Sequence, residues 1–109
     1  MLSVGDHDIL AGEDVIGAMA ASAYGGALGY APTAGTPALR DAIARRNVAM
    51  TGAETTAGEV MVTVGGQAAL FAAMQATLDP GDACVVIDPF YATFPLTVRA
   101  ATGRVVTVR

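Results

Sequence analysis

Three short apolar runs alternate with helical segments in the second half of the sequence, and this alternation constrains the fold more than any other feature. The runs are residues 60–64, 83–87 and 104–108, and each is rich in β-branched valine, which favours strands. Between them lie residues 67–78 and 91–101, which we predict to be helices. Parallel strands need crossover connections of this kind, so the order predicts an α/β fold with a parallel βαβαβ core.

The sheet of this core is expected to be apolar and incompletely covered. The run 83–87 is almost wholly apolar, which is typical of a parallel strand buried on both faces. The alternation stops after the run 104–108, so we expect a truncated domain that ends with its third strand. Such a sheet would leave an apolar edge and face exposed, and we expect low stability or dependence on a partner.

Two more helices are predicted ahead of this core. The first covers about residues 13–23 and opens with two acidic residues, which suit a helix N-terminus. The second covers about 37–50, with threonine before it and proline at its first position. A glycine-rich loop, 24–35, connects them. We therefore expect an N-terminal arm, helix and loop in residues 1–35, and the partial α/β domain in residues 36–109.

Charge and cysteine content exclude several classes of function. Ten acidic and six basic residues give a net charge of −4, with a pI near 4.6 and no basic stripe, which argues against nucleic acid as a partner. The single cysteine, Cys84, allows no internal disulfide and fits a reducing cytoplasm. No apolar run is long enough to span a bilayer. We expect a cytoplasmic protein with no membrane segment and no metal site.

The tripeptide Gly65-Gly66-Gln67 lies between a predicted strand and a predicted helix. Backbone N–H groups and the positive end of the helix dipole meet there, which suits a phosphate, and glycine allows close approach. An equally weighted alternative is that the glycines only permit a tight turn. The Gly-x-Gly-x-x-Gly fingerprint of dinucleotide-binding folds is absent. The Gly-Gly-Gln of translation release factors is disfavoured, because that function requires approach to RNA and this chain is acidic.

A second motif, Asp88-Pro89-Phe90-Tyr91, follows the run 83–87. Ligands of open α/β sheets bind along the carboxyl edge of the strands, where this motif and the glycine turn should both lie. An aromatic ring at this edge would stack on a planar ligand whose phosphate is held by the glycines. Ordinary packing is the alternative explanation for these aromatic side chains.

Four ordered segments together resemble the class I/II aminotransferases of fold type I, the aspartate aminotransferase family. They are Gly29-Tyr30-Ala-Pro-Thr-Ala-Gly35-Thr-Pro-Ala-Leu39-Arg40, Val62-Thr-Val-Gly-Gly-Gln-Ala-Ala-Leu70, Leu78-Asp-Pro-Gly-Asp82 and Asp88-Pro-Phe-Tyr-Ala-Thr-Phe-Pro95. The resemblance covers nearly the whole chain. It implies the N-terminal part of the family's large domain and, in the full-length family, transfer of an amino group between an amino acid and a 2-oxo acid with pyridoxal 5'-phosphate.

The resemblance also implies roles for individual residues. The backbone amides of Gly66 and Gln67 would hold the cofactor phosphate, while Gly65 shapes the turn. Tyr91 matches the aromatic residue that stacks on the cofactor ring. Tyr30 matches a tyrosine that reaches the phosphate of the neighbouring subunit, which implies a homodimer. Gly5 matches a glycine lining the substrate carboxylate pocket.

We predict no catalytic role for two other polar residues, His7 and Arg40. His7 stands where the family often has proline, and we interpret it as a solvated loop residue. Arg40 belongs to a cluster of arginines on the second predicted helix, and we interpret it as structural, with its aliphatic stem packed down.

All six basic residues are arginine, so these 109 residues contain no lysine. The family's reaction requires a lysine that binds the cofactor covalently and moves a proton, so we predict no catalytic residue here and no activity of the chain alone. Two hypotheses remain. The chain is an aminotransferase segment completed by a lysine on another polypeptide, or it is a non-catalytic α/β remnant with at most phosphate-binding ability.

Overall fold

The computed structural model describes residues 8–26 and 29–109, which form parts of two compact units, Met1–Ala31 and Pro32–Arg109. The described residues of the first unit include the helix α1 (Glu13–Tyr24), which agrees with the prediction to one residue at its end. Its first turn carries the two predicted acidic residues, and the helix is exposed along its whole length. Within the described residues, no helix is long and apolar enough to cross a membrane.

The second unit begins with α2 (Pro37–Thr51), which confirms the second predicted helix. Proline occupies its first turn. Gly52 follows the last residue of the helix, and its φ of +72° lies in the left-handed region that favours glycine. A short 3-10 helix, η1 (Ala57–Glu59), packs against α2. The side chain of Asn47 donates a 2.6 Å hydrogen bond to Thr55 between them, so the connector is tied back to the helix.

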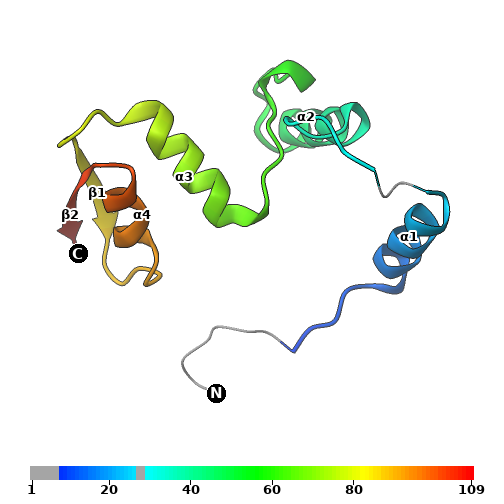
Figure 1. The fold of residues 1–109 in the computed structure, drawn as a ribbon, viewed down its shortest axis with the longest axis horizontal. Coiled ribbons are helices and arrows are strands. Elements are labelled where there is room, and N and C mark those ends of the chain that lie inside the picture. Colours follow the sequence, from blue (N-terminus) through cyan, green and yellow to red (C-terminus); the bar gives the residue numbers. More distant parts are fainter. Residues whose placement is uncertain (1–7, 27–28) are drawn as a thin grey trace. The chain divides into compact units, whose positions relative to one another are not determined.

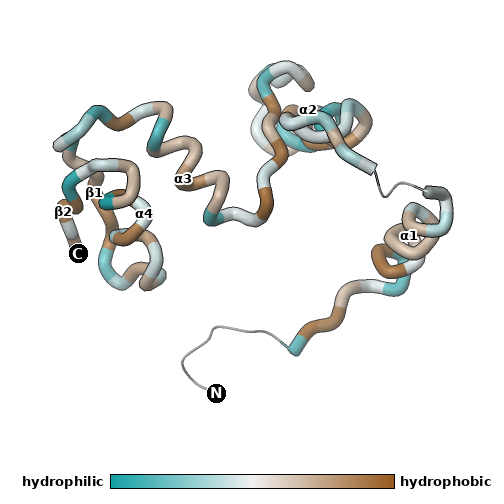
Figure 2. The backbone as a smooth tube through the Cα atoms, viewed as in Figure 1, coloured by the Kyte–Doolittle hydropathy of each residue, from teal (hydrophilic) through white to brown (hydrophobic). Residues whose placement is uncertain are grey.

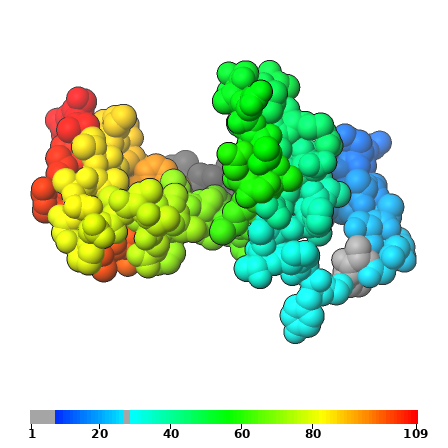
Figure 3. Space-filling view, turned by 90° about the horizontal axis from the view of Figure 1, so that it is seen from above, coloured from blue at the N-terminus to red at the C-terminus, as the bar shows by residue number. Residues whose placement is uncertain are grey.

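The remaining elements of the second unit are α3 (Gly65–Thr77), β1 (Ala83–Ile87), α4 (Phe94–Ala100) and β2 (Arg104–Val108). The two strands are parallel, as the sequence predicts, and they pair from Ala83↔Arg104 to Ile87↔Val108. Helix α4 forms the crossover between them and packs on both, while α3 contacts α4 (Figure 1). Figure 3 shows β1, α4 and β2, in yellow to red, as one contiguous mass of atoms.

The predicted strand at 60–64 is wrong: in the described part of the chain the sheet has two strands, β1 and β2. The segment 60–64 is apolar, as Figure 2 shows just before α3, yet no neighbouring strand pairs with it. Its contact with the preceding loop is a 3.0 Å bond from Val62 N–H to the Ala34 carbonyl. Val64 is 97% exposed. A strand needs a partner for its backbone groups, and apolar sequence alone does not supply one.

The predicted burial of residues 83–87 is also wrong. Val86 is buried, whereas Val85 and Ile87, which point to the opposite face, are 60% and 70% exposed. Strand side chains alternate between faces, and α4 covers one face of this sheet. The buried apolar residues among those described are few and small: Ala44, Val86, Pro95, Val98 and Ala101.

Two helix starts differ from the predictions. Helix α3 begins at Gly65 instead of residue 67, so both glycines belong to its first turn. Helix α4 begins at Phe94 instead of residue 91, because Pro95 has no N–H with which to bond the carbonyl of residue 91. The Tyr91 carbonyl instead accepts a 2.9 Å bond from the N–H of Phe94.

Candidate functional site

The N-terminus of α3 has the geometry of an open anion site. Gly65 has a φ of +78°, a conformation that side chains rarely adopt, and its N–H bonds the Thr63 carbonyl at 3.0 Å. No side chain caps the helix within the described residues. A Cβ added at Gly65 or at Gly66 would meet no atom within 4 Å, so the approach to the first-turn N–H groups is open. Donors of this kind fit a phosphate.

The side chain of Gln67 faces α4 and does not cap its own helix. Its amide oxygen accepts a 2.9 Å hydrogen bond from the hydroxyl of Thr93, and its amide nitrogen donates to the hydroxyl of Thr97. The Thr97 hydroxyl also donates to the Thr93 carbonyl at 2.9 Å. Sequence reasoning considered only the backbone of Gln67 and missed both threonines. They lie 26 and 30 residues away, and no local pattern marks such a pairing.

The aromatic motif after β1 borders an apolar groove of ≈ 420 Å³. Tyr91 is 60% exposed, and its ring centroid lies 5.9 Å from that of Phe94, at an interplanar angle of 59°. The groove is bounded by α3, by β1 and by the segment that leads into α4. Its lining residues are Leu70, Met74, Cys84, Val85, Val86, Ile87, Pro89, Phe90, Tyr91 and Phe94.

The glycine turn and the aromatic motif are therefore connected through α4. Thr93 and Thr97 bond the side chain of Gln67, while the N–H of Phe94 bonds the carbonyl of Tyr91. The residues present fit a planar ligand with an anionic group: free N–H donors for the anion, an exposed aromatic ring and an apolar wall.

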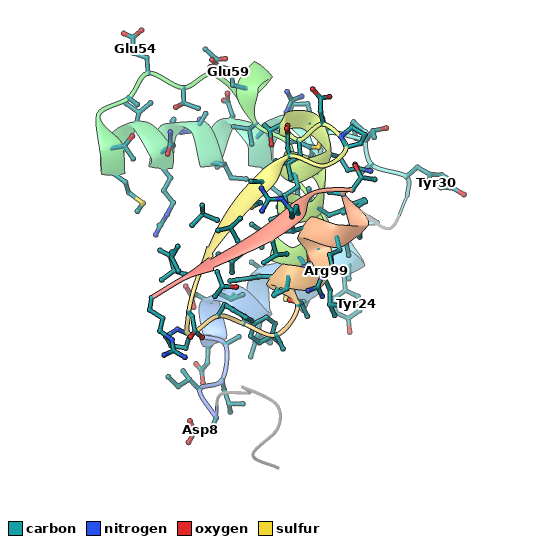
Figure 4. All side chains as sticks on the ribbon, turned by 90° about the vertical axis from the view of Figure 1, so that its left-hand side faces the viewer. Asp8, Tyr24, Tyr30, Glu54, Glu59 and Arg99 are labelled. Carbon is teal, nitrogen blue, oxygen red and sulfur yellow. The ribbon has the colours of Figure 1, made fainter. Side chains whose placement is uncertain are left out.

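The other residues singled out from the sequence lie elsewhere. Tyr30 is fully exposed and projects away from its loop (Figure 4). Arg40 donates from Nε to the Val60 carbonyl at 2.8 Å, which confirms its structural interpretation. Gly5 and His7 lie outside the described residues.

One carboxylate outside this site has a shifted pKa. Glu59, labelled in Figure 4, accepts 2.8 Å hydrogen bonds from the backbone N–H and from the hydroxyl of Thr56. These bonds favour the charged form, so they lower the pKa of the Glu59 carboxyl, and the backbone bond contributes most. The pair forms a capping box that fixes the start of η1.

Known proteins of similar sequence are aminotransferases. The aspartate/prephenate aminotransferase of Thermus thermophilus is 42% identical over 98% of this chain. The arginine–pyruvate transaminase of Pseudomonas aeruginosa is 38% identical over 99% of it. In both cases the match spans 28% of the relative's own length.

Solved structures agree with this assignment. The aspartate aminotransferase of Thermus thermophilus, in a complex with maleate, superimposes with a TM-score of 0.91 at 42% identity. The N-succinyldiaminopimelate aminotransferase of Mycobacterium tuberculosis does so with a TM-score of 0.90 at 32% identity. Each comparison covers 98% of this chain and 28% of the solved one. Residues 1–109 also match the family described as aminotransferase class I and II. The chain belongs to the class I and II aminotransferase family.

Proposed function

We propose that this chain is the N-terminal, cofactor-binding part of a pyridoxal-phosphate-dependent aminotransferase. In this proposal residues 1–35 form the N-terminal arm, helix and loop, and residues 36–109 form part of the large, cofactor-binding domain. The observation that carries it is the open N-terminus of α3, joined through Gln67 and α4 to the segment that bears Tyr91. A cytoplasmic location belongs to the same proposal.

The proposed roles follow from the chemistry of the donors. The N–H groups of Gly66 and Gln67 bind the phosphate, helped by the positive end of the α3 dipole, while Gly65 supplies the turn. Tyr91 stacks on the pyridine ring, and the apolar groove shields one side of it from water. When bound, pyridoxal phosphate supplies the electron sink for moving an amino group between an amino acid and a 2-oxo acid.

Groups beyond those described above complete this proposed site. Tyr30 is exposed and therefore free to reach the phosphate of a homodimeric partner. Gly5 is assigned to the substrate carboxylate pocket. Because these 109 residues contain no lysine, the group that binds the cofactor covalently and moves the proton must come from outside them.

A second candidate function is also compatible with the glycine turn and with these 109 residues, which contain no lysine. In this alternative the chain is a non-catalytic α/β remnant, or one subunit of a split enzyme, which binds phosphate and performs no chemistry. The two candidates share the glycine turn and differ in whether a complementing polypeptide restores transamination.

A titration with pyridoxal phosphate tests the phosphate site. Gly66→Asp puts a carboxylate in the first turn of α3, where it favours the helix but competes with an anionic ligand. We expect it to raise the Kd for pyridoxal phosphate at least about tenfold, and the neutral Gly66→Asn to raise it much less. A Cβ at this position would meet no neighbouring side chain within 4 Å. Equal affinity of both variants would exclude phosphate binding at this turn.

Co-expression separates the two candidates. The complementing chain is the remainder of the Thermus thermophilus aspartate/prephenate aminotransferase, taken after the region that matches this chain. Co-purification with amino-group transfer from aspartate to a 2-oxo acid supports the aminotransferase segment. Co-purification or separation without transfer supports the non-catalytic alternative.

A further inference from the structure

The contact between α3 and α4 includes hydrogen bonds between uncharged polar side chains. Gln67 lies in the first turn of α3, and Thr93 is the residue that precedes α4. Thr97 is buried, with 6% exposure. A buried hydroxyl must be hydrogen-bonded, and that of Thr97 accepts from Gln67 and donates to the Thr93 carbonyl. The network satisfies both ends of the Gln67 amide.

The two hydrogen bonds of the Gln67 side-chain amide fix more than the distance between α3 and α4. The oxygen and nitrogen of Gln67 are held by separate hydroxyls, from Thr93 and Thr97, which are one helical turn apart. This arrangement resists both sliding and rotation of the α3 N-terminus against α4, which a single contact would allow. The first-turn N–H groups are therefore held in one orientation relative to α4.

Tyr91 is held by contacts with the first residue of α4. Its carbonyl accepts the N–H of Phe94, the first residue of α4, and its ring packs against the Phe94 ring. The first-turn N–H groups of α3 and the ring of Tyr91 are thus both positioned by contacts with the N-terminal part of α4. Loss of the Gln67 hydrogen bonds would let the N–H groups of α3 move relative to the Tyr91 ring without unfolding either helix.

We propose that Gln67, Thr93 and Thr97 form a positioning clamp that sets the phosphate-binding turn of α3 relative to the Tyr91 ring. This inference rests on the proposed function and assigns new roles to the three side chains. None of them needs to touch the cofactor through its side chain. Their effect is to let one ligand occupy the phosphate turn and the aromatic subsite at once.

The clamp predicts a distinctive pattern of affinities. Inorganic phosphate uses the turn alone, pyridoxal uses the aromatic subsite alone, and pyridoxal phosphate spans both. In the double variant Thr93→Val/Thr97→Val, which keeps side-chain shape but removes both hydroxyls, we expect the Kd for pyridoxal phosphate to rise about tenfold. The Kd values for inorganic phosphate and for pyridoxal should each change less than about twofold. Calorimetric titration at low micromolar protein measures all three.

The conservative double variant Thr93→Ser/Thr97→Ser supplies the control, because it restores both hydroxyls and should recover most of the affinity for pyridoxal phosphate. Circular dichroism should show unchanged helix content in every variant. Unaltered affinity for pyridoxal phosphate in the valine variant overturns the clamp, and so does equal weakening of all three ligands. Failure of the unmodified chain to bind pyridoxal phosphate overturns the proposed function and the clamp together.

Discussion

Gly35 and Val62 lie so close that a methyl group at Gly35 would be 2.5 Å from Cγ2 of Val62. The contact lies beside the 3.0 Å bond from the Val62 N–H to the Ala34 carbonyl. Gly35 also has a φ of +97°, in the left-handed region. The loop before α2 and the segment before α3 thus meet at a point where only glycine fits.

We predict that Gly35→Ala destabilises the chain by more than about 1 kcal/mol, since it combines a steric clash with an unfavourable backbone angle. The urea midpoint followed by circular dichroism measures the loss. Gly58→Ala is the matched control, because its added Cβ makes an ordinary 3.5 Å contact with Thr56. A Gly35→Ala chain as stable as the Gly58→Ala chain would contradict the prediction.

Glu59 should titrate below the ordinary glutamate range in an NMR titration of its carboxyl carbon. The Thr56 bonds stabilise the charged form, so their contribution to folding is complete above the unfolded pKa of about 4.5 and is lost as pH falls through the lower folded value. Thr56→Ala removes the hydroxyl but keeps the backbone N–H, the larger cause. We therefore expect this variant to retain a lowered pKa, and a full return to the ordinary value would show that the hydroxyl dominates.

The segment 60–64 should exchange its amide hydrogens rapidly, except those of Val60 and Val62, which bond the carbonyls of Ala57 and Ala34. In the described residues no strand pairs with it, whereas β1 is paired with β2 along its whole length. Hydrogen exchange followed by mass spectrometry should find the Val64 amide unprotected and that of Val86, which faces β2, slower by at least about tenfold. Protection of 60–64 should rise in a complex that supplies a neighbouring strand. Protection equal to that of β1 in the isolated chain would refute this expectation.

Borohydride treatment in the presence of pyridoxal phosphate should label no internal residue. The 109 residues contain no lysine, so the N-terminal amine is the one primary amine available. Peptide mapping by mass spectrometry reads the result directly, with N-terminally acetylated chain as the control. A reduced adduct on any internal peptide would show that another side chain takes the role of lysine.

Local chemistry in the sequence was sufficient to predict most of the elements. The bounds of β1 and β2 were predicted to the residue, because valine-rich runs flanked by Asp82 and by Gly103 leave little choice. Helix α2 was predicted to within one residue from its proline start. Helix α3 was predicted as an element, but its start was placed at residue 67, because glycine has low helix propensity and both glycines were assigned to a turn.

Features that depend on distant partners could not be predicted. Residues 60–64 have the composition of a strand, but strand formation requires a neighbour that a valine run cannot specify. Burial of Val85 depends on what covers its face of the sheet. The bonds from Gln67 to Thr93 and Thr97 cross between two helices, and residue periodicity carries no signal of them.

Every side chain in the contact between α3 and α4 through Gln67 is electrically neutral. Added salt screens attraction between a phosphate and a helix N-terminus but leaves neutral hydrogen bonds almost unaffected. Ionic strength should therefore weaken ligand binding without loosening the alignment of the two helices. The affinity for inorganic phosphate and that for pyridoxal phosphate should decline in parallel as salt rises, at a constant ratio set by the geometry of this contact.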